Sequence, residues 1–449
     1  MSGKDASRRV IDFLKGHPNP SLLPPQAISD AARSAMSKSS VSIPALLYGA
    51  DEGYEPFRQA IAEWNSSFYG RAVSKHNIVI SGGASQNLAC VLQVFTDPVY
   101  TRNVWISSPA YMLVFRMFQD NGLTHKMRAV PEVDDGIDVE WLERELSRAD
   151  KAATASGEHS TKLKPDRNYS KYYRHVVYCV PTFSNPSSSI MPLERRRALV
   201  RCARKYDALI ITDDVYDQLQ WKADNTSDAD TETFAPLKSA LVPRLVDVDA
   251  ELDGGFERQG ADGFGNAMSN GSFSKILGPG TRCGWTEGSP KFVFGVSQVG
   301  SSRSGGSPSQ LTSTFLNELL QSGWLPNHIF GTLQPEYAAR YKIMASALQK
   351  YAIPLGCTMS VPDRYMGGYF IWLALPEGIS GDELTALCKA KEDLIIISGS
   401  QFEVPGEGRI THGGYVRLCF AWEEKSVMEE GVKRLASVLR KLKESSPSH

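Results

Sequence analysis

A single lysine stands in a setting that suits covalent chemistry. Residues 269–285 read SNGSFSKILGPGTRCGW, so that Lys275 follows two serines and Arg282 lies seven residues further on, after a Gly-Pro-Gly turn. A lysine amine can form a covalent bond with a carbonyl group, and serine hydroxyls and a guanidinium can bind an anion. A solvated surface strand that runs into a loop would also fit so short a match, so the rest of the chain must decide.

Three further groups of candidate site residues come shortly after hydrophobic runs. Ala84 and Ser85 come after a pair of glycines and open a predicted helix, where backbone N–H groups and a hydroxyl can cradle an anion. Asn185 follows a second run, and Asp213 with Tyr216 follows a third. Each has a plainer interpretation on its own, as a turn residue or a cap. A carboxylate that leaves a buried strand is costly, however, unless it meets a cation or a donor.

The hydrophobic runs that position these residues predict an α/β fold. Short runs rich in β-branched residues lie at 76–81, 103–107, 175–180 and 208–213, and helical spacing marks 192–206. Continuous apolar strands are typical of a mostly parallel sheet that is buried on both faces. Strands that alternate with helices indicate an α/β sandwich, and such sheets bind ligands at the carboxyl ends of their strands. We therefore expect the polar groups to meet at one edge of the sheet.

The chain divides into three parts by its patterns. Residues 1–50 are predicted to form an N-terminal arm and part of a small domain, 51–325 a large domain, and 326–449 the rest of a C-terminal small α+β domain. Two polar segments, 152–168 and 224–266, look like insertions that loop over the surface.

The composition excludes several classes of protein. The chain of 449 residues is 42% hydrophobic and has a net charge of -1, so it offers no basic field to nucleic acid or to an anionic membrane. Its seven cysteines are scattered singly, which indicates buried thiols in a reducing compartment and no metal site. No signal peptide is recognisable, and no apolar stretch reaches the about 18 residues of a membrane span. We expect a soluble cytoplasmic protein without metal, nucleic-acid or membrane partners.

In this order the motifs resemble those of the fold-type I pyridoxal-phosphate enzymes, specifically the class I/II aminotransferases. The branch that contains 2-aminoadipate and kynurenine aminotransferases is the most similar. The resemblance runs from Ile11 to about Leu442, and its most specific motif is S-x-S-K followed by G-x-R-x-G, with D-x-x-Y as a moderately specific one. It implies an aspartate-aminotransferase-like fold, with a mostly parallel seven-stranded sheet sandwiched by helices in the large domain and a small α+β domain.

The resemblance implies a catalytic set of Lys275, Asp213 and Tyr216 around pyridoxal 5′-phosphate. Lys275 would form the Schiff base with the cofactor aldehyde, and Asp213 would keep the pyridine nitrogen protonated. Tyr216 and Asn185 would hydrogen-bond to the phenolic oxygen of the ring. The phosphate would be held by the backbone of Ala84 and by Ser85, Ser272, Ser274 and Arg282.

Four more residues receive roles by the same resemblance. Tyr111 would stack on the pyridine ring, with a half-buried core aromatic as the plainer alternative. Arg417 would grip the α-carboxylate of the substrate, with Asn185 and Gly16 also lining the substrate site. Tyr48 would reach the phosphate of a neighbouring subunit, which implies a homodimer with shared active sites. The sequence departs from relatives in its cradle, where Ala84 stands in a place that is often polar and so leaves only its backbone to bind.

The expected reaction is transamination between an α-amino acid and a 2-oxo acid, in which Lys275 acts as both anchor and acid/base in a ping-pong cycle. A lyase, or a carbon–carbon bond-forming or cyclising enzyme of secondary metabolism, would use the same cofactor and residues. A non-catalytic regulator fits less well, because Lys275, Asp213 and Arg282 are intact and the family-like region starts by Ile11, which leaves no room for a helix-turn-helix. The amino donor and the oxo-acid acceptor are not encoded in these motifs.

Overall fold

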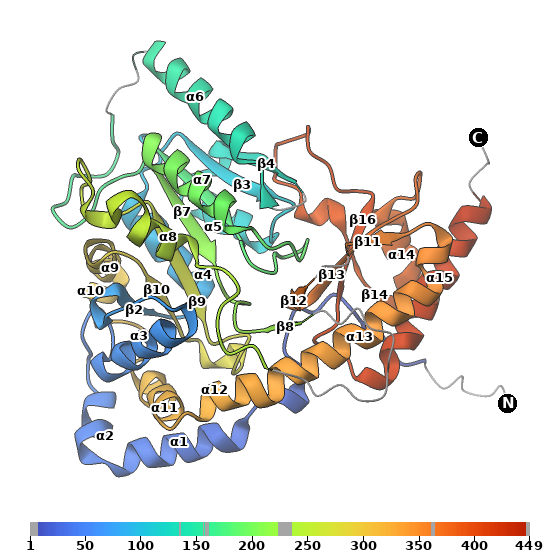
Figure 1. Ribbon diagram of the computed structural model, residues 1–449, viewed down its shortest axis with the longest axis horizontal. Helices are drawn as coiled ribbons and strands as arrows, with labels where there is room; N and C mark the ends of the chain where they lie inside the picture. The colour runs from blue at the N-terminus through green and yellow to red at the C-terminus, as the bar shows by residue number, and fades with distance from the viewer. Residues whose placement is uncertain are drawn as a thin grey trace.

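The computed structural model describes residues 8–133, 136–155, 157, 161–222, 236–360 and 364–445. They form a large unit built on one broad sheet and a smaller α+β unit, which α13 (Gln334–Tyr351) connects (Figure 1). No helix in the described part of the chain is long and apolar enough to cross a membrane.

The large sheet has the strand order β2-β10-β9-β7-β6-β3-β4-β5. Neighbours from β9 through β4 are parallel, while β10 runs antiparallel to both β2 and β9. The predicted seven-stranded, mostly parallel sheet is confirmed, and a two-residue strand, β5, extends its edge as an eighth. The strands are β2 (Ile78–Ser81), β3 (Asn103–Ser108), β4 (Met127–Val133), β5 (Gly136–Ile137), β6 (His175–Cys179), β7 (Ala208–Asp213), β9 (Ala267–Ser272) and β10 (Gly284–Glu287).

The central strands of this sheet are covered on both faces. Every residue of β6 and β9 is buried, as expected for a parallel sheet between two layers of helices. The continuous apolar run at 175–180 predicted this burial for β6, whereas β9 is largely polar in sequence and was not predicted. Figure 1 shows these helices around the sheet. They are α3 (Glu55–Tyr69), α4 (Ala84–Phe95), α5 (Leu113–Asp120), α6 (Val139–Ala155), α7 (Leu193–Lys205), α8 (Leu245–Glu251), α9 (Pro290–Ser297), α10 (Gly300–Arg303), α11 (Gln310–Gln321) and α12 (Trp324–His328).

The small unit combines the C-terminal part of the chain with the first described residues. Its four-stranded antiparallel sheet has the order β11-β13-β16-β15, and β1 pairs in parallel with β14 beside it. The chain then leaves for the large unit, where α1 packs against α11. The elements are β1 (Ile11–Asp12), α1 (Pro25–Ser37), α2 (Ser39–Ala45), β11 (Thr358–Met359), β13 (Phe370–Ala374), α14 (Gly381–Glu392), β14 (Leu394–Ile395), β15 (Ile397–Ser398), β16 (Tyr415–Cys419) and α15 (Lys425–Ser445).

A two-stranded antiparallel pair also links the units: β8 (Gln220–Lys222) with β12 (Tyr365–Gly367). The chain thus crosses between the units more than once, and side chains from both can meet in the space between them.

The expectation that 224–266 is a surface insertion is wrong for its second half. Residues 223–235 lie outside the described part, but α8 packs against α7 and β9, and Arg244 and Asp247 near its start are buried. The polar composition led to a wrong prediction of a surface loop because these charged residues are paired in the interior. In 152–168, residues up to Ala155 complete α6, and the backbone N–H groups of Leu163 and Lys164 donate to Asp97.

Candidate active site

A cavity of ≈ 320 Å³ lies at the carboxyl ends of the large sheet's parallel strands. Residues that end or follow β7 and β9 line it, and Phe370 and Arg417 of the small unit close its other side. Sheets of this kind bind ligands at this edge because the strand ends and helix N-termini meet there. The cavity brings together all but one of the predicted site residues, namely Gly16, Ala84, Ser85, Tyr111, Asn185, Asp213, Tyr216, Ser272, Ser274, Lys275, Arg282 and Arg417.

Lys275 follows the end of β9 and extends its amine into the cavity. The Nζ atom donates a hydrogen bond of 2.7 Å to the backbone oxygen of Gly16, and it lies 5.9 Å and 5.4 Å from the ring centres of Tyr216 and Tyr369. The Tyr369 hydroxyl donates to the Lys275 carbonyl at 2.9 Å and so fixes the backbone. Burial lowers the pKa of the Lys275 amine to about 8, so the charged form is in excess near neutral pH but the neutral form is also present.

Asp213 ends β7 and is held by two donors that the sequence did not reveal. Tyr178 donates its hydroxyl proton to Oδ2 at 2.6 Å, and Asn270 donates from Nδ2 to Oδ1 at 2.7 Å. Burial raises the pKa of Asp213 to about 6, against the effect of these two hydrogen bonds, which lower it. Asn270 is itself oriented by Asn87, which donates to its Oδ1 at 2.7 Å. Asn270 lies in β9, a strand that the sequence analysis did not predict, so no local signal identified it.

Arg417 lies on β16 and is 3% exposed. It donates from Nη1 to Asn185 at 3.0 Å and from Nη2 to the carbonyl of Leu14 at 2.5 Å, and its guanidinium carbon lies 4.1 Å from the ring centre of Phe370. Its Nε is buried and has no hydrogen-bond partner among the described residues. Burial lowers the pKa of Arg417, since the charged form is the one that loses water. A buried cation with an unused donor at a cavity wall suits a carboxylate ligand.

An anion cradle forms where α4 begins. Gly83 has a φ of 96°, and a Cβ placed there would lie 3.1 Å from Nη2 of Arg282. Arg282 donates to the carbonyls of Gly82 and Pro279 at 2.9 Å and 3.0 Å. The Ser272 hydroxyl donates a hydrogen bond of 3.0 Å to the hydroxyl oxygen of Ser274. Helix N–H groups, hydroxyls and a guanidinium therefore gather at one end of the cavity.

The three tyrosines with predicted roles lie in different surroundings. Tyr216 is buried in contact with the rings of Tyr369 and Phe370, at 5.5 Å and 6.0 Å between ring centres, and burial raises its pKa. Tyr111 is half-buried at the cavity wall, and burial raises its pKa as well. Tyr48 does not line this cavity and is 89% exposed.

Apolar side chains that the sequence reasoning did not single out form the remaining wall. They come from the N-terminal segment, from the start of α4 and from around α5, and the residues are Leu14, Leu88, Met112, Leu113, Val114 and Met117. Nothing in their local patterns distinguishes them from ordinary core or surface residues. These side chains line the same cavity as Arg417.

The donor set fits pyridoxal 5′-phosphate. The cradle offers hydrogen-bond donors and a guanidinium for a phosphate, Asp213 offers a carboxylate for a ring nitrogen, and Lys275 offers a primary amine for an aldehyde. The described residues contain no group of three His, Cys, Asp or Glu side chains that could hold a metal ion.

Comparisons with known proteins agree with this chemistry. The sequence profile described as "Aminotransferase class I and II" matches residues 16–435. An uncharacterized protein of Saccharomyces cerevisiae is 34% identical, with 96% of this chain and 97% of the relative covered. Aromatic-amino-acid aminotransferase 1 of Thermococcus litoralis is 28% identical over 96% of this chain and 88% of its own.

Among solved structures, kynurenine aminotransferase of Pyrococcus horikoshii, in complex with PMP, KYN and KYA, matches with a TM-score of 0.75 and 26% identity. The match covers 98% of this chain and 93% of that one. The predicted resemblance is thereby confirmed by profile, relatives and fold together. The chain belongs to the class I and II aminotransferases.

Proposed function

We propose that this pyridoxal-phosphate-dependent aminotransferase transfers the amino group of an α-amino acid with a large apolar side chain to a 2-oxo acid, with Lys275 as its central residue. The observation that carries the proposal is the position of the Lys275 amine in one cavity with Asp213, Arg417 and the anion cradle. These groups match, in order, a ring nitrogen, a substrate carboxylate and a phosphate.

The residues that would hold the cofactor divide by its parts. Asp213 would pair with the ring nitrogen, Tyr216 and Asn185 with the phenolic oxygen, and Tyr111 would stack on the ring. Bound pyridoxal phosphate supplies an electron-withdrawing ring that stabilises negative charge at the substrate Cα. The phosphate would be bound by the backbone of Ala84 and by Ser85, Ser272, Ser274 and Arg282.

The chain's own residues would then bind the substrate and move its proton. Arg417 would bind the α-carboxylate with two parallel N–H donors, and Asn185, already hydrogen-bonded to it, would keep the guanidinium in place. Lys275 would take the proton from the substrate Cα and deliver it to the cofactor carbon that carried the aldehyde, because an amine with a pKa of about 8 exists in both forms near neutral pH. Gly16, whose carbonyl binds Lys275, would lie against the substrate.

The apolar wall supports this class of amino donor. A side chain that packs against Leu14, Met112 and Met117 would be stabilised by about 25 cal/mol for each Å² of apolar surface removed from water. Aromatic and large aliphatic amino acids offer the most such surface. Similarity to an aromatic-amino-acid aminotransferase and to a kynurenine aminotransferase supports this choice.

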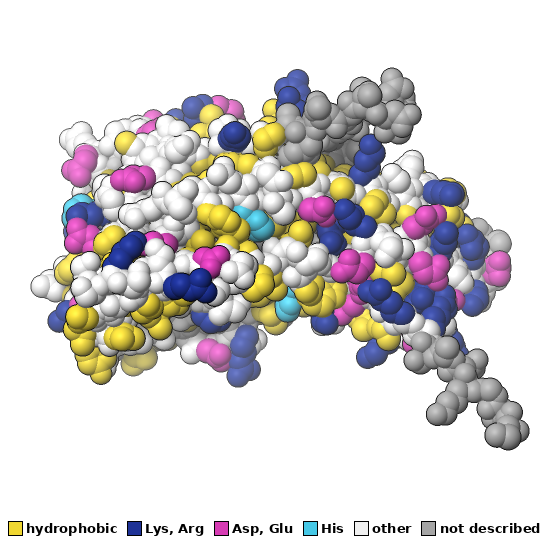
Figure 2. Space-filling model, turned by 90° about the horizontal axis from the view of Figure 1, so that it is seen from below, with side chains coloured by type: hydrophobic (Ala, Val, Ile, Leu, Met, Phe, Trp, Pro, Cys, Tyr) yellow, Lys and Arg dark blue, Asp and Glu magenta, His cyan; other side chains and the backbone are white. Residues whose placement is uncertain are grey.

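A homodimer would complete the site. Ile43, Leu46, Leu47 and Tyr48 are 60%, 72%, 63% and 89% exposed, an unusual run of exposed apolar side chains at the end of α2. In the view from below, hydrophobic side chains gather toward the left end of the molecule, where α1 and α2 lie in Figure 1 (Figure 2).

This apolar run also adjoins the anion cradle. Gln310 donates to the carbonyl of Pro44 in α2, and the next residue back, Ser309, donates to the carbonyl of Arg282. Arg282 and Ser85 are exposed in the single chain. A second copy that covers the run would bring its own Tyr48 to the cradle.

We also place the protein in the cytoplasm, because all seven cysteines are free and buried.

The test is a single half-reaction. The purified holoenzyme is mixed with phenylalanine, leucine or aspartate in the absence of an oxo acid, and pyridoxamine phosphate and the matching oxo acid are measured. We expect both products in equal amounts, fastest with phenylalanine. Release of ammonia without pyridoxamine phosphate would favour the lyase alternative, and a preference for aspartate would contradict the apolar donor class.

A further inference from the structure

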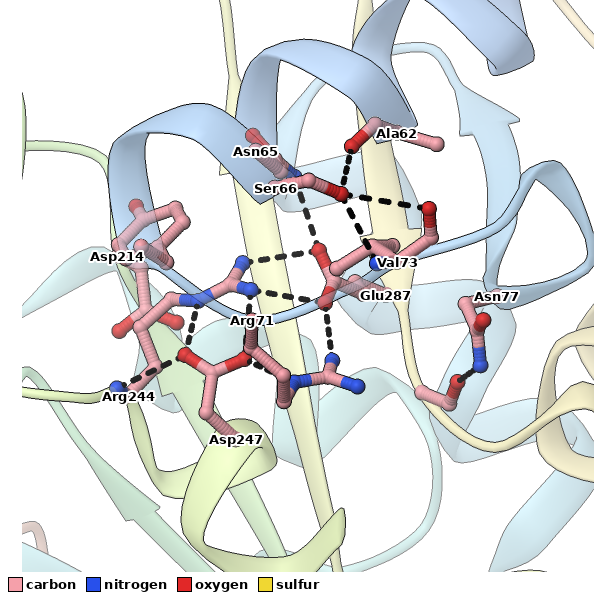
Figure 3. Close-up of polar contacts among 12 residues, drawn as sticks. Ala62, Asn65, Ser66, Arg71, Val73, Asn77, Asp214, Arg244, Asp247 and Glu287 are labelled. Atoms are coloured by element: carbon pink, nitrogen blue, oxygen red, sulfur yellow. Dashed lines mark hydrogen bonds and ion pairs between the residues drawn. The ribbon is translucent and has the colours of Figure 1, made fainter. Parts of the chain in front are cut away.

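A cluster of buried charges adjoins Asp213 without lining the cavity. Arg244, just before α8, donates to Asp247 from Nε at 2.9 Å and to Glu287 from Nη1 at 2.9 Å. Arg71 donates to the same two carboxylates, at 2.7 Å each. Figure 3 shows Arg244 between Asp247 and Glu287, with Asp214 beside it. The two arginines and two carboxylates thus balance one another.

Asp214 and Asp217 are not paired in this way. Each is 4% exposed, and their hydrogen-bond partners are hydroxyls: Thr212 donates to Asp214 at 2.7 Å and Tyr69 to Asp217 at 3.1 Å. A hydrogen bond from Ser269 also lowers the pKa of Asp214, against the larger effect of burial. The Oδ1 atom of each is buried and has no hydrogen-bond partner among the described residues. The two aspartates lie in one turn, in which the N–H of Asp217 donates to the carbonyl of Asp214 at 3.5 Å.

The cations that face this pair direct their N–H groups elsewhere. Arg244 donates to Asp247 and Glu287, as described. Arg196 is fully buried, and its hydrogen bonds go to Thr182 and to the carbonyls of Pro181, Met191 and Pro243. The other titratable groups near the pair are Tyr69, Cys179 and Asp213.

The cluster therefore holds three arginines, Arg71, Arg196 and Arg244, against four carboxyl groups, Asp214, Asp217, Asp247 and Glu287. One excess negative charge would remain in a dry interior if all four were ionised, and burial makes such a charge costly. Burial raises the pKa of both Asp214 and Asp217, and the negative charge of Asp214 raises that of Asp217 further.

We propose that Asp214 and Asp217 hold one proton between them at neutral pH and thereby set the charge that Asp213 experiences. The negative charge of Asp214 raises the pKa of Asp213, the next residue. If both members of the pair were ionised, Asp213 would be harder to keep as the anion that a protonated ring nitrogen needs. Both are positioning residues that act through Asp213, and the inference rests on the proposed function only for the role of Asp213.

The proton count is tested by comparing the wild-type holoenzyme with the double variant Asp214→Asn/Asp217→Asn. The pair keeps one proton in the folded state that the unfolded chain releases above about pH 4. The wild type should therefore lose stability relative to the variant as pH rises, and the ratio of their unfolding constants should change about tenfold per pH unit between about pH 5 and 7. A ratio that does not change with pH would mean that both aspartates are ionised. A ratio that changes about a hundredfold per pH unit would mean that both are protonated. Either result overturns the proposal.

Infrared spectroscopy tests the same proton without unfolding the protein. The difference spectrum of wild type minus double variant at neutral pH should contain the carbonyl band of a protonated carboxylic acid. Asp249→Asn, which removes a buried carboxylate that pairs with Arg204 outside this cluster, should retain this band while it lowers the melting temperature. Absence of the band from the wild type would overturn the proposal.

The effect on Asp213 has its own readout. In the double variant, the pH titration of the bound cofactor's absorbance should shift to lower pH, because one negative charge near the protonated ring nitrogen is lost. An unshifted titration would overturn the link to Asp213. The stability and infrared results do not depend on turnover, so a protein that failed to transaminate would leave the proton count intact.

Discussion

The proposed role of Arg417 depends on the geometry of its guanidinium. A guanidinium presents two parallel donors, whereas a lysine amine is a point charge, so Arg417→Lys should leave the protein folded and yellow but lose about 1.5–3 kcal/mol of a charged hydrogen-bond contact. This corresponds to a fall of about ten- to more than a hundredfold in kcat/KM for α-amino acids. The measurement is kcat/KM for phenylalanine.

The comparison substrate is an amine without an α-carboxylate, whose slow turnover should be unchanged by Arg417→Lys. A matched variant is Arg434→Lys, since Arg434 is also a buried arginine but lies on α15 and donates to Glu430 and to backbone carbonyls. It should keep kcat/KM. Equal losses on both substrates would mean that Arg417 supports the fold or the cofactor.

A substitution at Asp213 would distinguish a role in cofactor binding from a role in cofactor chemistry. Asp213→Asn should still bind pyridoxal phosphate, because the phosphate cradle is elsewhere, but an amide cannot keep the ring nitrogen protonated. We expect kcat to fall by roughly 10²–10³-fold, the usual cost of losing a fixed electrostatic contact. Equilibrium binding and single-turnover kinetics in one variant provide the two measurements. Wild-type turnover would remove Asp213 from the catalytic set.

Lys275 can be identified chemically. Borohydride treatment of the holoenzyme should attach a cofactor-derived mass to Lys275, because reduction makes the link between an amine and an aldehyde permanent. Peptide mass spectrometry locates the label, and Lys275→Arg serves as the unlabelled control. A label on another lysine would end the assignment.

At the scale of elements, the start of α4 matters most, since Ala84 and Ser85 in its first turn line the cavity. Gly83→Ala should weaken cofactor binding, because a φ of 96° is strained for alanine by about 1–3 kcal/mol and the new Cβ would lie 3.1 Å from Arg282. This predicts a rise of about five- to more than a hundredfold in the cofactor Kd.

The neighbouring glycine offers a matched control. A Cβ on Gly82 would meet nothing closer than the flexible side chain of Gln86 at 3.5 Å, so Gly82→Ala should bind cofactor almost normally. Fluorescence titration of the cofactor-free proteins gives both constants. If the two variants bound equally well, the close approach of Gly83 to Arg282 would have no role in the cradle.

At the scale of the whole molecule, the proposed homodimer predicts sharing of active sites. If Tyr48 crosses to the partner's cradle, a heterodimer of Lys275→Ala and Tyr48→Phe chains contains one doubly damaged site and one intact site. Its activity should exceed that of both parent homodimers, measured on tag-purified mixed dimers. A protein that stays monomeric at micromolar concentration in sedimentation would exclude this arrangement.

The sequence alone determined the elements and the order of the motifs. Strand positions such as 208–213 and the helix at 192–206 follow from local hydrophobic patterns, which do not depend on distant parts of the chain. The roles of Lys275 and Asp213 followed from a resemblance carried by short motifs. The same reasoning misplaced the segment after 236, because composition cannot distinguish a solvated charge from a buried, paired one.

Only the tertiary structure decided which side chains meet. Asn270 contacts Asp213 from 57 positions away because β7 and β9 are neighbours in the sheet, and Tyr178 reaches it from β6 on the other side. The apolar wall and the unpaired Asp214 and Asp217 likewise depend on packing between elements. A local pattern fixes which face of a strand is buried, but strand order and helix packing fix what that face touches.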